Sequence, residues 1–192
     1  MADSYIRFIK VDTQEAIDVK AIDNGDGTYS LSMAQGAGGE PVDVQVTPTT
    51  DTSDYASGDI IFDTTALAGF VVGSGNHAIL ENIRIIEAAD QAAFSGYIYF
   101  LRSNVSMGSI NGAPNISDAN AKEIVGRIPF AISDWVDLGG CKELNLSSGA
   151  IGLPKRMKAT TGTTLYIAMV ATSDPGTFTA SSMDVLCTFA PN

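Results

Sequence analysis

The sequence is poor in the residues that most often build catalytic and metal sites. Among its 192 residues are one histidine, His77, and two cysteines, Cys141 and Cys187. A lone histidine would have to recruit the rest of a zinc site or a Ser-His-Asp assembly from unrelated loops, so we expect a structural or surface role. The cysteines lack CxxC spacing, and a reducing compartment favours two buried free thiols over a disulfide.

Motifs typical of an active site are also missing. Ser74 lies in "GSG" without the G-x-S-x-G elbow, and the sequence contains neither a P-loop nor G-x-G-x-x-G. Two carboxylate pairs, Asp59 with Asp63 and Asp134 with Asp137, stand near turns, where such residues ordinarily cap and bend the chain. The sequence therefore predicts no enzyme activity, no cofactor and no metal.

Long apolar runs are absent as well. No stretch reaches the ~18 apolar residues of a membrane span. Met1-Ala2-Asp3-Ser4 has neither the basic nor the apolar region of a secretory signal. We expect synthesis in the cytoplasm and no membrane partner.

Positive charge is scarce, especially at the front of the chain. Residues 1–63 hold 12 Asp and Glu against 3 Lys and Arg, and the whole chain has a net charge of −11. Such a surface repels phosphate backbones, so we expect no nucleic-acid partner. One basic run, Lys155, Arg156 and Lys158 in "LPKRMK", is either a solvated strand end or a contact for an acidic protein partner or subunit.

The stretch "VKAIDNGDGTYSLSM", residues 19–33, could be a calcium loop or a turn between two strands. The calcium pattern fails, because Ile22 and Met33 would occupy the first ligand position and the closing glutamate position. Asn-Gly and Asp-Gly between two alternating runs favour a β-hairpin.

Short runs rich in β-branched and aromatic residues fill most of the chain and predict an antiparallel sandwich or barrel. They are "SYIRFIKV", "IDVKAI", "TYSLSM", "VDVQVT", "GDIIFD", "HAILENIRIIEA", "FSGYIYFLRS", "GRIPFAI", "GLPKRMKA", "TLYIAMVAT" and "SMDVLCTF". One short connecting helix is predicted in "SDANAKEIV", with Ser117 as N-cap, Asp118 in the first turn and Gly126 ending it after about two turns.

The polar segment at residues 47–59, "TPTTDTSDYASGD", is interpreted as a joint. It divides an acidic N-terminal β-hairpin arm, residues 1–48, from a β-sandwich domain, residues 49–192. Within that domain "FSGYIYFLRS" and "TLYIAMVAT" are apolar on both faces, which predicts mid-sheet strands that need cover on both sides. A second sheet supplies one cover, and the arm or a neighbouring subunit could supply the other, so we expect a homo-oligomer.

A resemblance to a known family adds to these expectations. The segments that carry it are "DYASGDII", "ILENIRIIE" with "YIYFLRSN", "ISDANAKEIVGRIPF", "DWVDLG" and "GLPKRMKATTGTTLYIAMVATSDPGTFTASSMDVLCTF". Together they resemble the head decoration proteins of tailed bacteriophages, over about residues 5 to 190, and the stretch at 19–33 resembles the arm that often precedes that module. The resemblance implies a jelly-roll-like sandwich, assembly on a capsid surface and no chemistry.

The function expected from these features is that of a virion cement protein, which binds the major capsid protein on the outer shell, with a trimer favoured. An exposed edge strand could add to a partner's sheet, and we assign this contact to "SYIRFIKV", with Tyr5, Phe8 and Ile9. The alternative for this run is an ordinary edge strand of its own domain.

Other functional classes also remain open at this stage. One is a phage tail, neck or fibre protein. Another is a carbohydrate-binding jelly roll with an exposed platform at Trp135 or Tyr55, although the size of Trp135 favours a core position. A hydrolase would require a cleft that gathers His77 with carboxylates.

Overall fold

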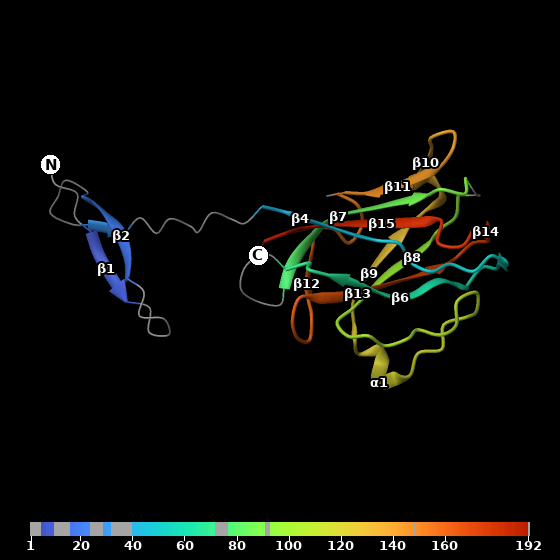
Figure 1. Ribbon diagram of the computed structural model, residues 1–192, viewed down its shortest axis with the longest axis horizontal. Helices are drawn as coiled ribbons and strands as arrows, with labels where there is room; N and C mark the ends of the chain where they lie inside the picture. The colour runs from blue at the N-terminus through green and yellow to red at the C-terminus, as the bar shows by residue number, and fades with distance from the viewer. Residues whose placement is uncertain are drawn as a thin grey trace. The chain divides into compact units, whose positions relative to one another are not determined.

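A computed structural model describes residues 5–9, 16–23, 29–31, 40–71, 77–90, 93–147 and 149–191. The chain divides into two compact units, Met1–Gly39 and Glu40–Asn192. In both units the described strands pair antiparallel, and helix is confined to two short segments (Figure 1).

The first unit contains a three-stranded sheet in the order β1 (Tyr5–Ile9), β2 (Ala16–Asp23) and β3 (Tyr29–Leu31). Asp23 of β2 lies opposite Tyr29 of β3, which confirms the predicted hairpin. The turn itself, residues 24–28, lies outside the described residues. Because β1 pairs only with β2, it is an edge strand of this sheet among the described residues.

The second unit consists of two larger sheets and a small ribbon. The first sheet has the order β10 (Trp135–Asp137), β11 (Lys142–Leu146), β7 (His77–Glu87), β15 (Met183–Ala190) and β4 (Val42–Val46), and β12 (Lys155–Lys158) also pairs with β7. The second sheet has the order β6 (Ile60–Ala68), β13 (Thr164–Ala171), β8 (Gly96–Leu101) and β9 (Ile124–Phe130). The ribbon pairs β5 (Asp54–Tyr55) with β14 (Gly176–Thr177).

The strand order is that of a jelly roll. Numbering β4, β6, β7, β8, β9, β11, β13 and β15 from 1 to 8 gives the orders 6-3-8-1 in the first sheet and 2-7-4-5 in the second. The chain thus passes repeatedly from one sheet to the other, as in other jelly rolls. The predicted all-β, jelly-roll-like antiparallel sandwich is confirmed, as are the mid-sheet positions of β8 and β13.

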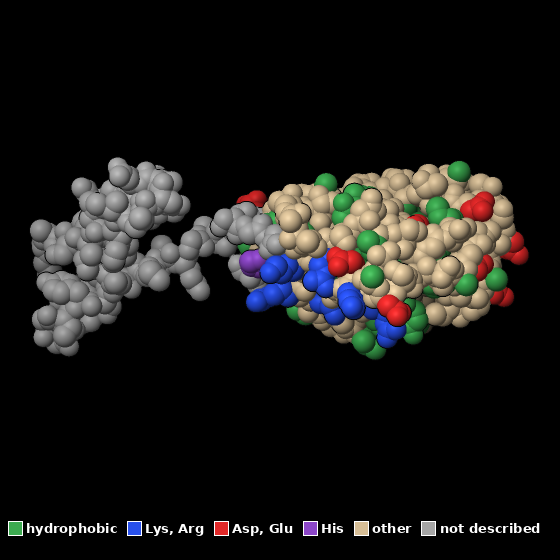
Figure 2. Space-filling view, turned by 90° about the horizontal axis from the view of Figure 1, so that it is seen from below, with side chains coloured by type: hydrophobic (Ala, Val, Ile, Leu, Met, Phe, Trp, Pro, Cys, Tyr) green, Lys and Arg blue, Asp and Glu red, His purple; other side chains and the backbone are tan. Residues whose placement is uncertain are grey.

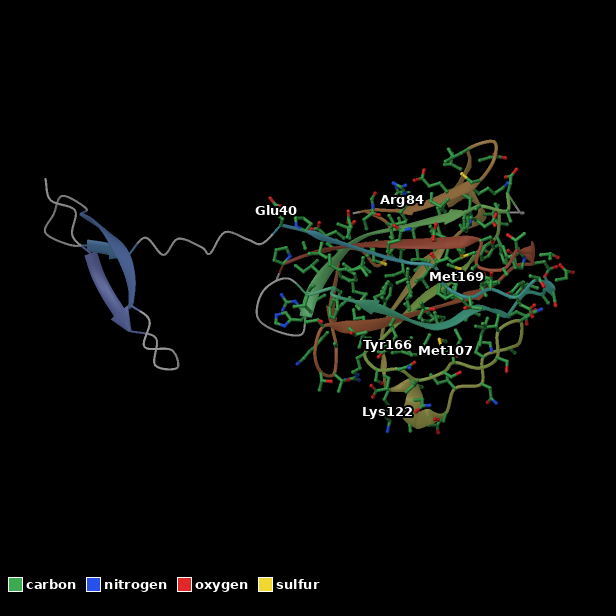
Figure 3. All side chains as sticks on the ribbon, in the orientation of Figure 1. Glu40, Arg84, Met107, Lys122, Tyr166 and Met169 are labelled. Carbon is green, nitrogen blue, oxygen red and sulfur yellow. The ribbon has the colours of Figure 1, made fainter. Side chains whose placement is uncertain are left out.

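The main core lies between the two sheets and follows from period-two alternation. In β15 the residues Met183, Val185, Cys187 and Phe189 are buried, and the residues between them are not. Figure 3 shows Met169 of β13 between the sheets, whereas Met107 and Tyr166 lie on the other side of the second sheet, toward helix α1 (Asp118–Ala121).

A smaller core on that outer side covers part of the second sheet. The loop of residues 102–123 brings Met107, 2% exposed, onto the outward-facing residues of the sheet. This cluster consists of Ile60, Leu101, Met107, Ala168 and Val170. The chain's own loop therefore covers part of the face for which an arm or a neighbouring subunit was expected.

The predicted helix begins at the expected residue but is shorter than predicted. The side chain of Ser117 accepts a hydrogen bond from the N–H of Asn120, and α1 ends at Ala121 with Lys122 as its C-cap. Gly126, expected to end the helix, lies in the middle of β9, because the β-branched run that follows pairs with β8. A Cβ at this position would lie 3.0 Å from Met157 Cε and from Lys155 Cε, so a larger residue would require these side chains to shift.

The segment at residues 47–59 is a packed part of the second unit and not the joint that was predicted. Tyr55 is 2% exposed, and β5 pairs with β14. The polar composition reflects local hydrogen bonds, since Asp51 Oδ1 accepts from the N–H groups of Thr52 and Ser53. β4, which was assigned to the arm, pairs with β15, so the units divide after Gly39.

Candidate functional site

The carboxylates considered for catalysis serve as acceptors for main-chain N–H groups. Asp59 accepts from the N–H of Ala56 at 2.7 Å, and Asp63 accepts from that of Met107 at 2.8 Å. Asp134 accepts from the N–H of Ala131 at 2.7 Å, and Asp137 accepts from the N–H of Gly139 at 2.7 Å. The interpretation as turn and cap residues is confirmed for Asp59, Asp134 and Asp137, but it is wrong for Asp63, which lies within β6 and binds the distant loop at Met107.

His77 is partly buried at the first position of β7, opposite Lys158 of β12. Within the described ranges, no group of three or more His, Cys, Asp and Glu is placed to hold a metal ion. Ser74 lies outside those ranges. Both cysteines are free thiols, as predicted, but the burial predicted for both is found for Cys187 alone, and Cys141 is partly exposed. No helix of the described part is long and apolar enough to span a membrane.

The two aromatic residues proposed as a sugar platform are buried. Trp135 is 9% exposed, and its Nε1–H donates to the carbonyl oxygen of Phe94 at 2.8 Å. Tyr55 packs edge-on against Phe178 with ring centroids 5.3 Å apart. The core interpretation of Trp135 is confirmed, and a stacking platform at Trp135 or Tyr55 is excluded.

Two other aromatic residues reach the surface, at positions where no site was predicted. Tyr97 and Tyr99 of β8 are partly exposed, with ring centroids 6.2 Å apart. The guanidinium carbon of Arg127, on β9, lies 4.5 Å from the centre of the Tyr97 ring. The alternation in "GYIYFL" was the available signal, because it places both tyrosines on the same face of the strand.

Exposed apolar side chains gather near η1 (Ile132–Asp134), a single 3-10 turn, and the edge strand β10 that follows it. Ile132 is 52% exposed and Val136 is 54% exposed. A groove of about 470 Å³ lies nearby, between β9, β11 and the loop that contains Ile151, which is 77% exposed. The lining is mixed, because Asp134, Asn145 and Ser147 stand beside apolar side chains.

The residues assigned to contacts lie on two edge strands. Tyr5, Phe8 and Ile9 all belong to β1. Lys155, Arg156 and Lys158 all belong to β12, which pairs along one side with residues 77–80 of β7. No described strand pairs with the other side of β12.

Some basic residues of the second unit have an ion-pair partner, whereas Lys122, Arg127 and the three cations of β12 have none in the part of the chain that the structure describes. Arg84 pairs with Glu143 at 3.2 Å, and Lys142 pairs with Asp90 at 2.5 Å, a hydrogen bond that raises the pKa of Lys142. Among the described residues, by contrast, the side chains of Lys155, Arg156 and Lys158 have no ion-pair partner. Met157 between them is fully buried and anchors the strand in the core.

An acidic surface surrounds the ribbon of β5 and β14. Asp54 and Asp174 line a hollow of about 320 Å³ together with Tyr55 and Gly176. Asp174 accepts from the N–H of Ser57 at 2.8 Å, so a neutral donor fixes its position without cancelling its charge. Backbone hydrogen bonds from Ser53 and Thr52 lower the pKa of Asp51, which keeps this carboxyl ionised.

Figure 2 shows how these charges are distributed over one face of the second unit. Lys and Arg side chains extend from His77, the only histidine, to the middle of this face with some Asp and Glu among them, whereas the opposite end shows Asp and Glu alone. The described unit therefore has a basic end and an acidic end.

Comparison with known proteins assigns no family. No protein-family model matches the sequence, and no curated protein matches it. A solved structure of a full particle of Israeli acute paralysis virus is similar at 9% identity and a TM-score of 0.28, covering 80% of this chain and 70% of that chain. A structure of the infectious bursal disease virus Gt strain is similar at 9% identity and a TM-score of 0.21, covering 95% of this chain and 50% of that chain. Likeness at this level assigns no function.

Proposed function

We propose that the protein is a non-enzymatic structural component of a bacteriophage virion, which binds the major capsid protein on the outer surface of the shell as a decoration or cement protein. The observation that carries the proposal is the separate first unit, Met1–Gly39, whose sheet has β1 at its edge. The sequence resemblance to phage head decoration proteins supports the same role.

A unit of this size needs something to bind. Three short strands within residues 1–39 offer little apolar area to bury, and chains below about 40 residues seldom hold a core unaided. Docking on a larger surface would stabilise such a unit. Strand addition through β1 would also satisfy the main-chain groups on its free side, with Tyr5, Phe8 and Ile9 supplying side-chain specificity.

The second unit suits a structural role because the groups considered for catalysis are used within the fold. The carboxylates considered for catalysis accept hydrogen bonds from main-chain N–H groups, and the aromatic core is closed around Trp135. Jelly rolls occur in capsid proteins and in lectins, among others. An oligomer that carries several first units would hold several capsid subunits at once and gain avidity from modest single contacts.

The test is co-sedimentation of the purified protein with mature shells of its parent phage that lack it. We expect saturable binding by the full chain and none by a chain that begins at Glu40, because truncation there leaves β4 and the jelly roll intact. A triple variant, Tyr5→Ala with Phe8→Ala and Ile9→Ala, should lose most of the binding.

The matched control is a triple variant in the neighbouring strands of the same sheet, Lys20→Ala with Ser30→Ala and Asp18→Ala. It should bind like the natural sequence. Binding that survives removal of residues 1–39 would contradict the arm as anchor, and absence of any binding to shells would contradict the decoration role.

A further inference from the structure

The two charged ends of the second unit are too far apart to neutralise each other within one chain. β12 lies beside residues 77–80 at the start of β7, whereas β5 and β14 adjoin the other end, where Met183 pairs with Glu87. The 11 residues of β7 span roughly 30 Å. This exceeds the screening length of about 8 Å at physiological salt several times over.

We propose that the basic edge strand β12 of one copy docks on the acidic end of a second copy. Lys155, Arg156 and Lys158 would face Asp54 and Asp174 of the neighbouring chain. The occupant is a second copy because the charges that β12 lacks are present on this same chain. Residues 51–59, around β5, contain three Asp and no Lys or Arg.

Both surfaces are built to accept a partner. Arg156 and Lys158 are exposed, and Met157 holds the strand that carries them in the core. At the other end, Asp54 and Asp174 are exposed and flank the hollow of about 320 Å³. Such an arrangement steers two copies into one orientation and repels the like-charged alternatives.

Lysines on an edge strand also guard against unselective pairing with other sheet edges. That role explains why the edge is charged, but it does not explain the uncompensated acidic surface at the opposite end. Mutual docking accounts for both. Since the two surfaces differ, the contact is head-to-tail, and it closes into a ring if the rotation between copies allows closure.

The experiment is sedimentation velocity of the full chain and two charge-reversed variants. The first carries Lys155→Glu, Arg156→Glu and Lys158→Glu, and the second carries Asp54→Lys and Asp174→Lys. We expect the natural chain to self-associate, with a dissociation constant roughly tenfold higher in 0.5 M than in 0.05 M salt. Each variant alone should be monomeric, because both of its ends then carry the same sign.

An equal mixture of the two variants should associate again, because each reversed end meets a complementary reversed end. A control with Glu40→Lys and Asp118→Lys, which changes the net charge as much as the acidic-end variant but outside both clusters, should associate like the natural chain. If a reversed variant fails to fold, Lys155→Gln with Lys158→Gln and Asp54→Asn with Asp174→Asn take its place, each expected to weaken association.

Three results would each overturn the proposal: a natural chain that stays monomeric at every concentration, single variants that associate like the natural chain, or a mixture that remains monomeric. The experiment uses no shells, so its outcome is separate from that of the capsid-binding test.

Discussion

Replacing Tyr55 with phenylalanine tests whether the segment before β6 is a packed part of the jelly roll. The Tyr55 hydroxyl accepts from the N–H of Asp51 at 2.6 Å and donates to the carbonyl oxygen of Ile61 at 3.1 Å. Without it, both main-chain groups lose a partner in a buried or partly buried setting. At roughly 1–1.5 kcal/mol for each, the free energy of unfolding should fall by about 2–3 kcal/mol.

In a domain of this size, such a loss corresponds to a decrease in melting temperature of roughly 4–12 °C. Thermal and urea unfolding at neutral pH measure it, with unchanged secondary structure by circular dichroism. The matched control is Tyr97→Phe, because the hydroxyl of Tyr97 has no hydrogen bond among the described residues. A Tyr55→Phe variant that melts like the control would refute the idea that this hydroxyl ties the segment to the core.

Three further outcomes follow from buried side chains. Burial raises the pKa of Tyr55 from 10.0 to about 12, so the folded state keeps this proton at a pH where the unfolded state loses it. The free energy of unfolding should therefore decrease as pH rises from 10 towards 12. Urea unfolding measured across this pH range should show a shallower decrease for Tyr55→Phe. Trp135→Phe removes the hydrogen bond to Phe94, so the free energy of unfolding measured in urea should fall by roughly 1–3 kcal/mol. Trp135 is the only tryptophan in the sequence, and a fluorescence maximum typical of an exposed tryptophan in the folded protein would contradict its burial. A thiol reagent should modify only Cys141 in the folded protein, because burial protects the thiol of Cys187 and raises its pKa. Modification of both cysteines in the folded chain would contradict the burial of Cys187.

The elements found from the sequence are those whose signal is local. Alternation identified the long central strands, and tandem Asn-Gly and Asp-Gly identified the hairpin that the pairing of β2 and β3 confirms. β11 was missed, because "KELNL" contains only two apolar residues and its place beside β7 depends on tertiary pairing. For the same reason the sequence predicted the start of α1 but not its end, where pairing between β8 and β9 takes over.

The candidate surfaces show the same division. The basic strand was visible because its three cations lie within four consecutive residues. The acidic end was not, because Asp174 reaches Ser57 across a separation of 117 residues, which only the ribbon of β5 and β14 closes. The loop that covers the second sheet was hidden too, since Met107 stands in a mostly polar stretch whose docking face the sequence does not reveal.

The cover that residues 102–123 place over the second sheet has a consequence for the order of events in assembly. An obligate oligomer leaves an apolar face that only a partner can bury, so its folding and association are one process. Here Met107 and its neighbours bury part of that face within the chain. The jelly roll should therefore fold before it associates, and a pool of finished subunits can accumulate before any neighbour is met.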